Sequence, residues 1–402
     1  MCFQRQIDAL ALPLSSVNRH MLAYVGGKAA NLGEMIQAEG KTIPVPPGYV
    51  ITANAYRKFV KGALKESNGQ LKLLLDKLDE MAQDYHDDLL SEVRELGQKI
   101  RGLMENTSIP EDVCQAITEE YQKLFQETDS ISANPSAVAV RSSATAEDLP
   151  SSSFAGQQDT FLNVIGLDSV LRHVQLCWAS LYTDRAIVYR LKNKFDHHKI
   201  YLCVVVQKQI DPISSGIMFT ADALSGHRYT TVIEAGYGLG EALVSGLINA
   251  DQYKVDQKKG IITECIIGDQ NLEIVPVYGK SEGLGGTKTI ALSKERSKAQ
   301  KLSKNQILQL AKMGMKVQNH YGVPQDMEWC FERGTHKLYV VQARPITTLF
   351  PVPLIPPTSD VNSLRVYVSI GHIQVMTDPI RPLGRSVFQH IFSLNENSKA
   401  VY

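Results

Sequence analysis

The chain has 402 residues, 44% of them hydrophobic and 21% charged, which is ordinary for a globular protein with two or three domains. Its 42 basic residues balance its 42 acidic ones. A neutral chain has no overall field that attracts nucleic acid or an anionic membrane surface, so neither is an expected partner.

The cysteines and the hydropathy pattern indicate the compartment. Six cysteines lie far apart with no C-x-x-C pair, which favours buried free thiols over a disulfide framework. No apolar run is long enough to span a bilayer, and the short N-terminal LALPL run does not resemble a signal peptide. We therefore expect a cytoplasmic protein.

The first 198 residues predict an α/β subdomain. A loop with Gly26-Gly27-Lys28 precedes a helix at about Ala29–Ala38, and a Pro-rich turn leads to a strand at Tyr49–Ile51. Residues 54–128 carry apolar side chains at helical spacing and predict a helical insert. An apolar strand then runs into Arg141, which this pattern places at a strand end.

Residues 199–348 predict a second subdomain. It follows a helix at about Leu167–Lys192 and opens with a Val-rich strand at Ile200–Ile210. We expect a compact mixed sheet, a glycine-rich loop at Lys280–Thr287 and an amphipathic helix at Lys294–Tyr321. The sheet strands are expected at residues 215–220, 230–235, 251–255 and 260–264, and a hairpin at residues 326–332 and 337–342. Residues 349–360 read as a Pro-rich linker, and residues 361–402 as the start of a further domain.

The segment after the Arg141 strand reads as a polyphosphate site. Arg141 is a fixed cation followed by the hydroxyls of Ser142, Ser143 and Thr145, which can surround phosphate oxygens. The alternative is a structural arginine paired with Glu147 or Asp148. Further along this segment, Gly156 and Thr160 fit a phosphate or ribose contact, although a plain turn explains them about as well.

Two glycine patterns carry less information. Lys28 can place an ammonium on a nucleotide phosphate, but a surface lysine in a turn is the alternative, and the Walker A spacing is missing. Gly236, Gly238 and Gly240 follow G-x-G-x-G rather than G-x-G-x-x-G, so we reject a dinucleotide-binding fingerprint.

The last hairpin offers oxygen ligands beside a cation. Asp326, Glu328, Gln342 and Arg344 lie on its two strands, and the period of two turns each strand's pair to one face. Carboxylate and amide oxygens suit Mg²⁺, and a guanidinium suits polyphosphate, whereas a solvent-facing ion pair is the alternative. Gln207, on the strand that leads into the second sheet, is placed to hydrogen-bond an adenine edge.

Together these motifs resemble the ATP-binding module of the phosphoenolpyruvate synthase and pyruvate phosphate dikinase family, from about Val17 to Thr348. The resemblance implies an ATP-grasp-like, two-subdomain fold that binds ATP and Mg²⁺. The motifs that carry it are VGGKAANLGEM, VPPGYVIT, AVRSSATAEDLPSSSFAGQQDTFLNV, SGIMFT, GLGEALVSGLINADQYKV and the QDMEWCFE/VVQARPIT hairpin. The ATP-binding residues it implies are Lys28, Arg141, Gly156, Thr160, Gln207, Glu328, Gln342 and Arg344.

The resemblance also implies roles. Lys28, Arg141 and Arg344 would neutralise charge on the transferring phosphoryl group, and Glu328 and Gln342 would hold Mg²⁺. In such enzymes ATP gives its β-phosphate to a histidine on a swivelling domain, releasing AMP and phosphate, and the histidine phosphorylates an acceptor. Val366–Gln389 is similar to the start of the antibiotic-binding domain of rifampicin phosphotransferases, so the acceptor is rifamycin-like or pyruvate.

The ten histidines include none in the glycine- and threonine-flanked setting of that swivelling domain, and His372 lacks this setting too. We therefore expect the nucleotide half of a phosphotransferase that works with a phosphohistidine domain elsewhere in a longer chain or in trans. The alternative is a truncated, non-catalytic ATP-binding protein.

Overall fold

A computed structural model describes residues 8–38, 43–82, 89–126, 137–145, 160–193, 195, 200–277 and 285–349. The chain divides into two compact units, Met1–Thr347 and Thr348–Tyr402, and all elements given below belong to the first. The Pro-rich linker from residue 350 on, the start of a further domain at 361–402 and most of the glycine-rich loop at 280–287 lie outside the described residues.

The first sheet has five strands in the order β1-β2-β5-β3-β4, with every neighbouring pair antiparallel. Its central strand, β5, is almost wholly buried, which suits its run of Val residues because both faces are covered. The strands are β1 (Ala11–Pro13), β2 (Gly48–Ile51), β3 (Ala137–Ala144), β4 (Thr160–Ile165) and β5 (Leu202–Lys208).

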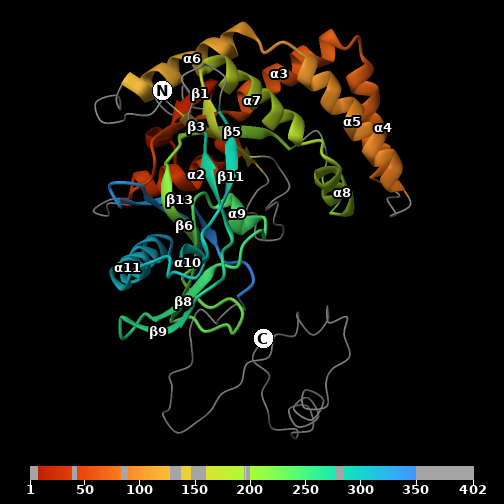
Figure 1. The fold of residues 1–402 in the computed structure, drawn as a ribbon. Helices are drawn as coiled ribbons and strands as arrows, with labels where there is room; N and C mark the ends of the chain where they lie inside the picture. The colour runs from red at the N-terminus through yellow and green to blue at the C-terminus, as the bar shows by residue number, and fades with distance from the viewer. Residues whose placement is uncertain are drawn as a thin grey trace, which may run out of the picture. The chain divides into compact units, whose positions relative to one another are not determined.

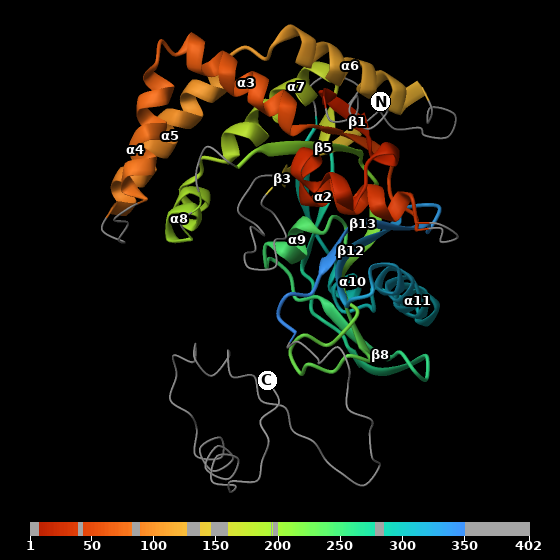
Figure 2. The ribbon, with the colours of Figure 1, turned by 180° about the vertical axis from the view of Figure 1, so that it is seen from behind.

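Helices cover both faces of this sheet. On one face, α3, α6 and α7 contact the strands and α4, α5 and α8 pack behind them, around a core that includes Phe59 and Trp178 (Figure 1). On the other face, α2 packs against β3 and β5 (Figure 2). The helices are α2 (Leu22–Ile36), α3 (Ala53–Glu66), α4 (Gln70–Met81), α5 (Leu90–Asn106), α6 (Glu111–Gln126), α7 (Leu167–Ser180) and α8 (Asp184–Lys192).

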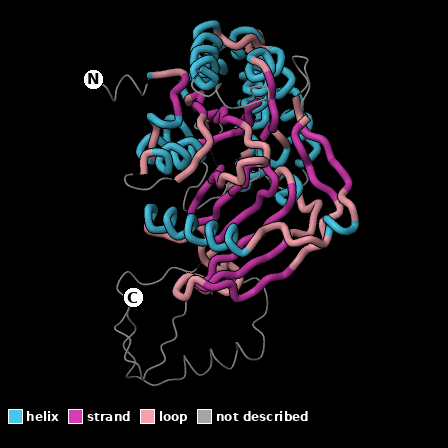
Figure 3. Tube along the Cα trace, turned by 60° about the vertical axis from the view of Figure 1, so that its left-hand side comes forward, coloured by secondary structure: helices cyan, strands magenta, loops and turns pink. Residues whose placement is uncertain are grey.

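The second sheet has six strands in the order β13-β12-β6-β7-β8-β9, joined to the first by the short segment after β5. Figure 3 shows its long strands, in magenta, and the helices that cover the first sheet, in cyan. A two-stranded sheet, β10-β11, stands beside it. The strands are β6 (Pro212–Phe219), β7 (Thr230–Tyr237), β8 (Asp251–Asp256), β9 (Ile261–Ile266), β10 (Leu272–Pro276), β11 (Thr287–Ala291), β12 (Gln325–Glu332) and β13 (Leu338–Pro345); the helices are α9 (Glu241–Val244), α10 (Lys294–Ser297) and α11 (Lys304–Tyr321).

This helix-and-sheet composition confirms the α/β class, with four differences from the expected elements. Helix α2 begins at Leu22, so Gly26, Gly27 and Lys28 lie within it and not in a loop before it. The second sheet is not mixed, because all its neighbouring strands are antiparallel. The helix expected at 167–192 is broken at Thr183, which is extended, while the Tyr182 carbonyl accepts a bond from Arg101. The helix expected at 294–321 is broken before Ser303, which caps α11 in a capping box with Gln306.

The two sheets share one hydrophobic core. Val205 of β5 and Val25 of α2 belong to the same buried cluster as Trp329 of β12 and Leu310 of α11. The residues that join the sheets therefore lie in a continuous packed interior. None of the described helices is both long and apolar enough to cross a membrane.

Candidate nucleotide site

Arg141 lies inside strand β3 rather than at its end, which corrects the expectation from sequence. The strand continues to Ala144 because Ser142 and Ser143 pair with Val204 and Cys203 of β5, and these small side chains are buried. Arg141 is therefore held by backbone pairing on both sides. That rigidity suits a binding group.

Two other predicted residues share the sheet face of Arg141. Thr160 of β4 lies directly opposite Arg141, and side chains of directly opposed residues share a face. Ala139, two residues before Arg141, lies opposite Gln207 of β5 in the same way. Arg141, Thr160 and Gln207 thus belong to the face on which α2 packs.

The Arg141 guanidinium crosses to the second sheet. Its Nη2 donates to Oε2 of Glu328 at 2.7 Å and to Oε1 of Gln342 at 3.0 Å, and its Nη1 donates to the carbonyl of Val341 at 2.9 Å. The side chain is 11% exposed, and among the described residues its buried Nε has no hydrogen-bond partner. A buried cation with a spare N–H donor fits a phosphate oxygen.

The β12–β13 hairpin places two polar pairs in adjacent rungs. Glu328 lies opposite Gln342, and Asp326 lies opposite Arg344. The Arg344 Nε and Nη2 atoms both lie 2.8 Å from Oδ2 of Asp326, so Arg344 pairs with Asp326 and not with Glu328. Burial raises the pKa of the Asp326 carboxyl, as does the Glu328 charge, whereas Arg344 opposes the rise.

Lys28 follows a kink in α2 that is fitted to β3. Gly26 has φ +75° and ψ 168°, and a Cβ there would lie 2.1 Å from the Ser143 carbonyl oxygen. The Ser143 hydroxyl donates to the Val25 carbonyl and accepts from the Ala29 N–H. The backbone around Lys28 is thereby fixed beside Ser143, two residues after Arg141.

Gln207 is almost fully buried near the end of β5, and its amide donates to the Pro46 carbonyl at 3.0 Å. The other predicted positions are not all visible. Gly156 lies outside the described residues, as do Glu147 and Asp148, the local partners considered for Arg141.

The side chains of Glu328 and Gln342 offer oxygen ligands of the kind that Mg²⁺ prefers. Mg²⁺ is usually held by one or two protein carboxyl or amide oxygens, with phosphate oxygens and water completing the shell. The neighbouring oxygens of Glu328 and Gln342 fit that description, and both now accept from Arg141. The described residues contain no cluster of three or more His, Cys, Asp or Glu able to bind a metal alone.

Two features of this region are not apparent from the sequence. The sequence places Asp326 on the hairpin but does not indicate that it pairs with Arg344. Asn163 of β4 has a left-handed backbone with φ +55° and is completely buried. Its one sequence signal is an asparagine within an apolar strand, since asparagine tolerates that conformation.

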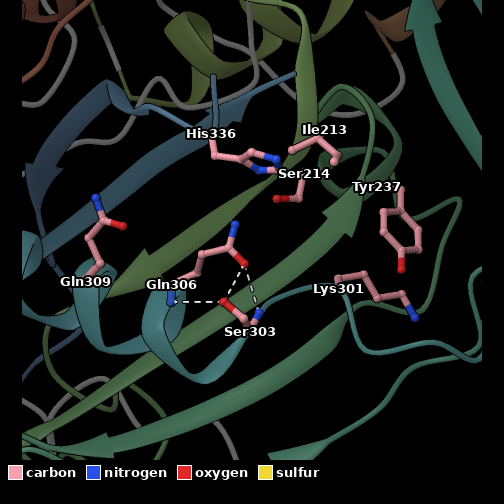
Figure 4. Close-up of a pocket in the computed structure, with 8 residues that line it drawn as sticks. All are labelled: Ile213, Ser214, Tyr237, Lys301, Ser303, Gln306, Gln309 and His336. Carbon is pink, nitrogen blue, oxygen red and sulfur yellow. Dashed lines mark hydrogen bonds between the residues drawn. The ribbon is translucent and has the colours of Figure 1, made fainter. Parts of the chain in front are cut away.

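A cavity of about 400 Å³ lies elsewhere, at the N-terminus of α11 (Figure 4). Its walls include Ser303 and Gln306, which bond each other, and Lys301, whose ammonium already contacts Asp251 at 3.0 Å. None of the predicted nucleotide residues lines it. Arg141 of β3 and the polar side chains of the hairpin are therefore the better candidate for a triphosphate.

Two packed sheets, with arginine and oxygen ligands between them, define an α/β domain suited to ATP. Comparison with known families agrees: residues 22–351 match the model described as "Pyruvate phosphate dikinase, AMP/ATP-binding domain". The chain belongs to this family. The resemblance seen in the motifs is thus confirmed.

Curated relatives carry two names. The chain is 45% identical over 382 residues to a rifampicin phosphotransferase of Bacillus subtilis, covering 95% of this chain and 40% of the relative. It is 39% identical over 357 residues to a phosphoenolpyruvate synthase of Pyrococcus furiosus, covering 83% of this chain and 43% of the relative. The chain therefore spans about two fifths of the length of these relatives.

Proposed function

We propose that this chain is the ATP- and Mg²⁺-binding part of a dikinase-type phosphotransferase with an ATP-grasp-like fold. ATP, an acceptor and water would yield phospho-acceptor, AMP and phosphate through a phosphohistidine domain supplied by a longer chain or in trans. The observation that carries the proposal is the convergence of Arg141, Glu328 and Gln342 from two sheets. The acceptor, rifamycin-like or pyruvate, and the cytoplasmic location remain predictions.

The residues suggest how ATP would be held. Arg141 would turn its donors from Glu328 and Gln342 to phosphate oxygens, to which a guanidinium forms bidentate, charge-assisted bonds. Glu328 and Gln342 would then be free to hold Mg²⁺, which supplies charge neutralisation on the phosphates. Lys28 and Arg344 would add positive charge around the transferring group, and Gln207 would face the adenine.

Replacing Arg141 tests nucleotide binding. Arg141→Ala is expected to weaken ATP binding about 10- to 100-fold in the presence of Mg²⁺, because it removes charge-assisted bonds to phosphate. Isothermal titration measures the affinity. Arg172→Ala, which breaks an arginine–glutamate pair on α7 with Glu105, is the matched control and should bind ATP normally. Parent-like affinity in Arg141→Ala would remove the assignment.

A second experiment separates transfer from binding. The chain is mixed with ATP, Mg²⁺ and a separately produced phosphohistidine domain from a rifampicin phosphotransferase, and AMP and phosphate are quantified. Equal amounts of both above a no-domain control support the phosphotransferase proposal. Tight ATP binding with no AMP above background supports the alternative, a non-catalytic ATP-binding protein.

A further inference from the structure

Strand β4 contains an irregularity beside Arg141. Val138 lies opposite Val164, but Val140 lies opposite Phe161, so Leu162 and Asn163 together face the single residue Ala139. Two residues opposite one constitute a β-bulge, a feature that often re-aims side chains next to functional sites. Asn163 has the left-handed backbone at this bulge.

The bulge decides which side chain stands next to Arg141. An unbroken ladder continued from Val138 and Val164 would put Phe161 opposite Arg141 and move Thr160 opposite Ser142. A shift of one residue moves a side chain to the other face of the sheet. Thr160 would then leave the face of Arg141, and an aromatic ring would replace its hydroxyl.

The observed packing agrees with the shifted register. Phe161 packs toward the helical face, where its ring lies 4.8 Å from that of His173 on α7, measured between centroids. Thr160 is exposed and opposite Arg141. The bulge therefore places the Phe161 ring in the core and the Thr160 hydroxyl on the face of the candidate site.

Contacts of Asn163 hold the bulge in place. Its side-chain Nδ2 donates to the backbone carbonyls of Val277 at 2.7 Å and Gly286 at 2.8 Å. The backbone carbonyl of Asn163 accepts from the Gly286 N–H at 2.9 Å. Gly285 approaches so closely that a Cβ there would lie 2.3 Å from the Asn163 carbonyl oxygen. A non-glycine residue persists in a left-handed conformation when its surroundings fix it in this way.

We propose that Asn163 is a positioning residue of the nucleotide site, whose left-handed backbone sets Thr160 beside Arg141. This inference rests on the proposed function and on the ATP contact of Thr160 that the family resemblance implies. Asparagine suits both tasks: it tolerates the left-handed region, and its amide supplies two donors for two carbonyls. A β-branched residue such as valine neither tolerates the left-handed region nor supplies these donors.

A double-mutant cycle on ATP affinity tests the proposal. Thr160→Ala and Asn163→Val are each expected to weaken ATP binding about tenfold, and the double variant should be no weaker than either, because both remove the same contact. Asn163→Gly adopts the left-handed conformation freely and should restore affinity to within about twofold of the parent. If Asn163→Val does not fold, Asn163→Ala takes its place in the cycle.

Asn68→Val is the matched control. Asn68 also has a left-handed backbone, with φ +50°, in the turn between α3 and α4. Its replacement should lower stability without changing ATP affinity. Multiplicative losses in the cycle, or an Asn163→Gly variant as weak as Asn163→Val, would overturn the role of Asn163. Parent-like affinity in Arg141→Ala would instead overturn the proposed function itself.

Discussion

A single guanidinium, that of Arg141, connects strand β3 of the first sheet to the β12–β13 hairpin of the second. Its position after an apolar run predicted a fixed cation at a strand end, but the structure shows a largely buried cation inside the strand. The local sequence offered only Glu147 and Asp148 as partners, whereas the observed carboxylate is Glu328, 187 positions away. Local patterns report propensity and burial, but a partner from another sheet follows from tertiary packing. Asn163 was missed because its role depends on a backbone angle and a register.

Asp326 is predicted to make stability depend on acidic pH. Its pKa is raised above the ordinary 3.8, so above pH 3.8 the folded chain retains a proton that the unfolded chain has lost. Its contribution to the free energy of unfolding therefore falls as the pH rises through the raised pKa. Asp326→Asn lacks this fall, so its stability relative to the parent should improve with pH across that window, as measured by urea unfolding.

Asp256→Asn provides a control of opposite sign. Hydrogen bonds from the backbone N–H groups of Lys259 and Lys258 hold the pKa of the Asp256 carboxyl below its ordinary value. The stability that this carboxylate contributes is present above pH 3.8 and is lost as the pH falls. Its replacement should therefore become more harmful as the pH rises. The same trend in both variants would contradict the assignment to Asp326.

Lys301 and Asp251 form an ion pair whose side chains are both completely buried, with Nζ 3.0 Å from Oδ1. Lys301→Met leaves the Asp251 carboxylate buried without its counter-charge, so the free energy of unfolding should fall by about 3–5 kcal/mol. Denaturant titration measures the loss. Lys259→Met, which removes a largely exposed lysine paired with Asp256, should change it by less than about 1 kcal/mol. Similar losses in the two variants would contradict this account.

Among the elements, the position of single strands and helices was more predictable than their breaks. The helical spacing of Leu71, Leu74, Leu75, Leu78 and Met81 predicts a helix, and all five lie on α4, where the four leucines are buried and Met81 is partly buried. The break before α11 had a readable signal in the Ser303–Gln306 capping box, but the periodicity concealed it. The antiparallel second sheet could not be predicted because strand order depends on contacts between distant segments.

The kink in α2 is predicted to be essential to the α2–β3 contact. In Gly26→Ala the added methyl group would clash with the Ser143 carbonyl oxygen, and alanine disfavours the φ of +75°. The substitution should therefore lower both thermal stability and ATP affinity. Gly102→Ala on α5 is the control, because a Cβ there meets no atom within 4 Å. It should stabilise the protein by about 0.5–1 kcal/mol. An unaltered ATP affinity in Gly26→Ala would show that the kink does not position Lys28.

At the scale of the whole described unit, the two sheets are expected to unfold together. The subdomains share one buried cluster that runs from Val205 of the first sheet to Trp329 of the second. A continuous core gives cooperative, two-state unfolding more readily than two separate cores. The subdomain boundary expected between residues 198 and 199 is still a prediction, because a core shared by both sheets does not locate it.

The two tryptophans allow this cooperativity to be measured. Trp178 lies in the helical core of the first sheet and Trp329 in the core shared with the second. In Trp178→Phe and Trp329→Phe variants, the fluorescence of the remaining tryptophan should change at the same urea concentration as the circular dichroism of that variant. Separate midpoints in either variant would indicate that the two sheets unfold independently.

The long reach of Arg141 has a consequence for how the chain matures on the ribosome. Its partners Glu328, Val341 and Gln342 follow it by 187 to 201 residues. Most strands of the first sheet are synthesised long before this hairpin emerges, so domains that form from the N-terminus can fold early. The cluster of Arg141, Glu328 and Gln342 is completed only when β13 has been made. Nucleotide binding would then begin with the finished domain and not with a nascent one.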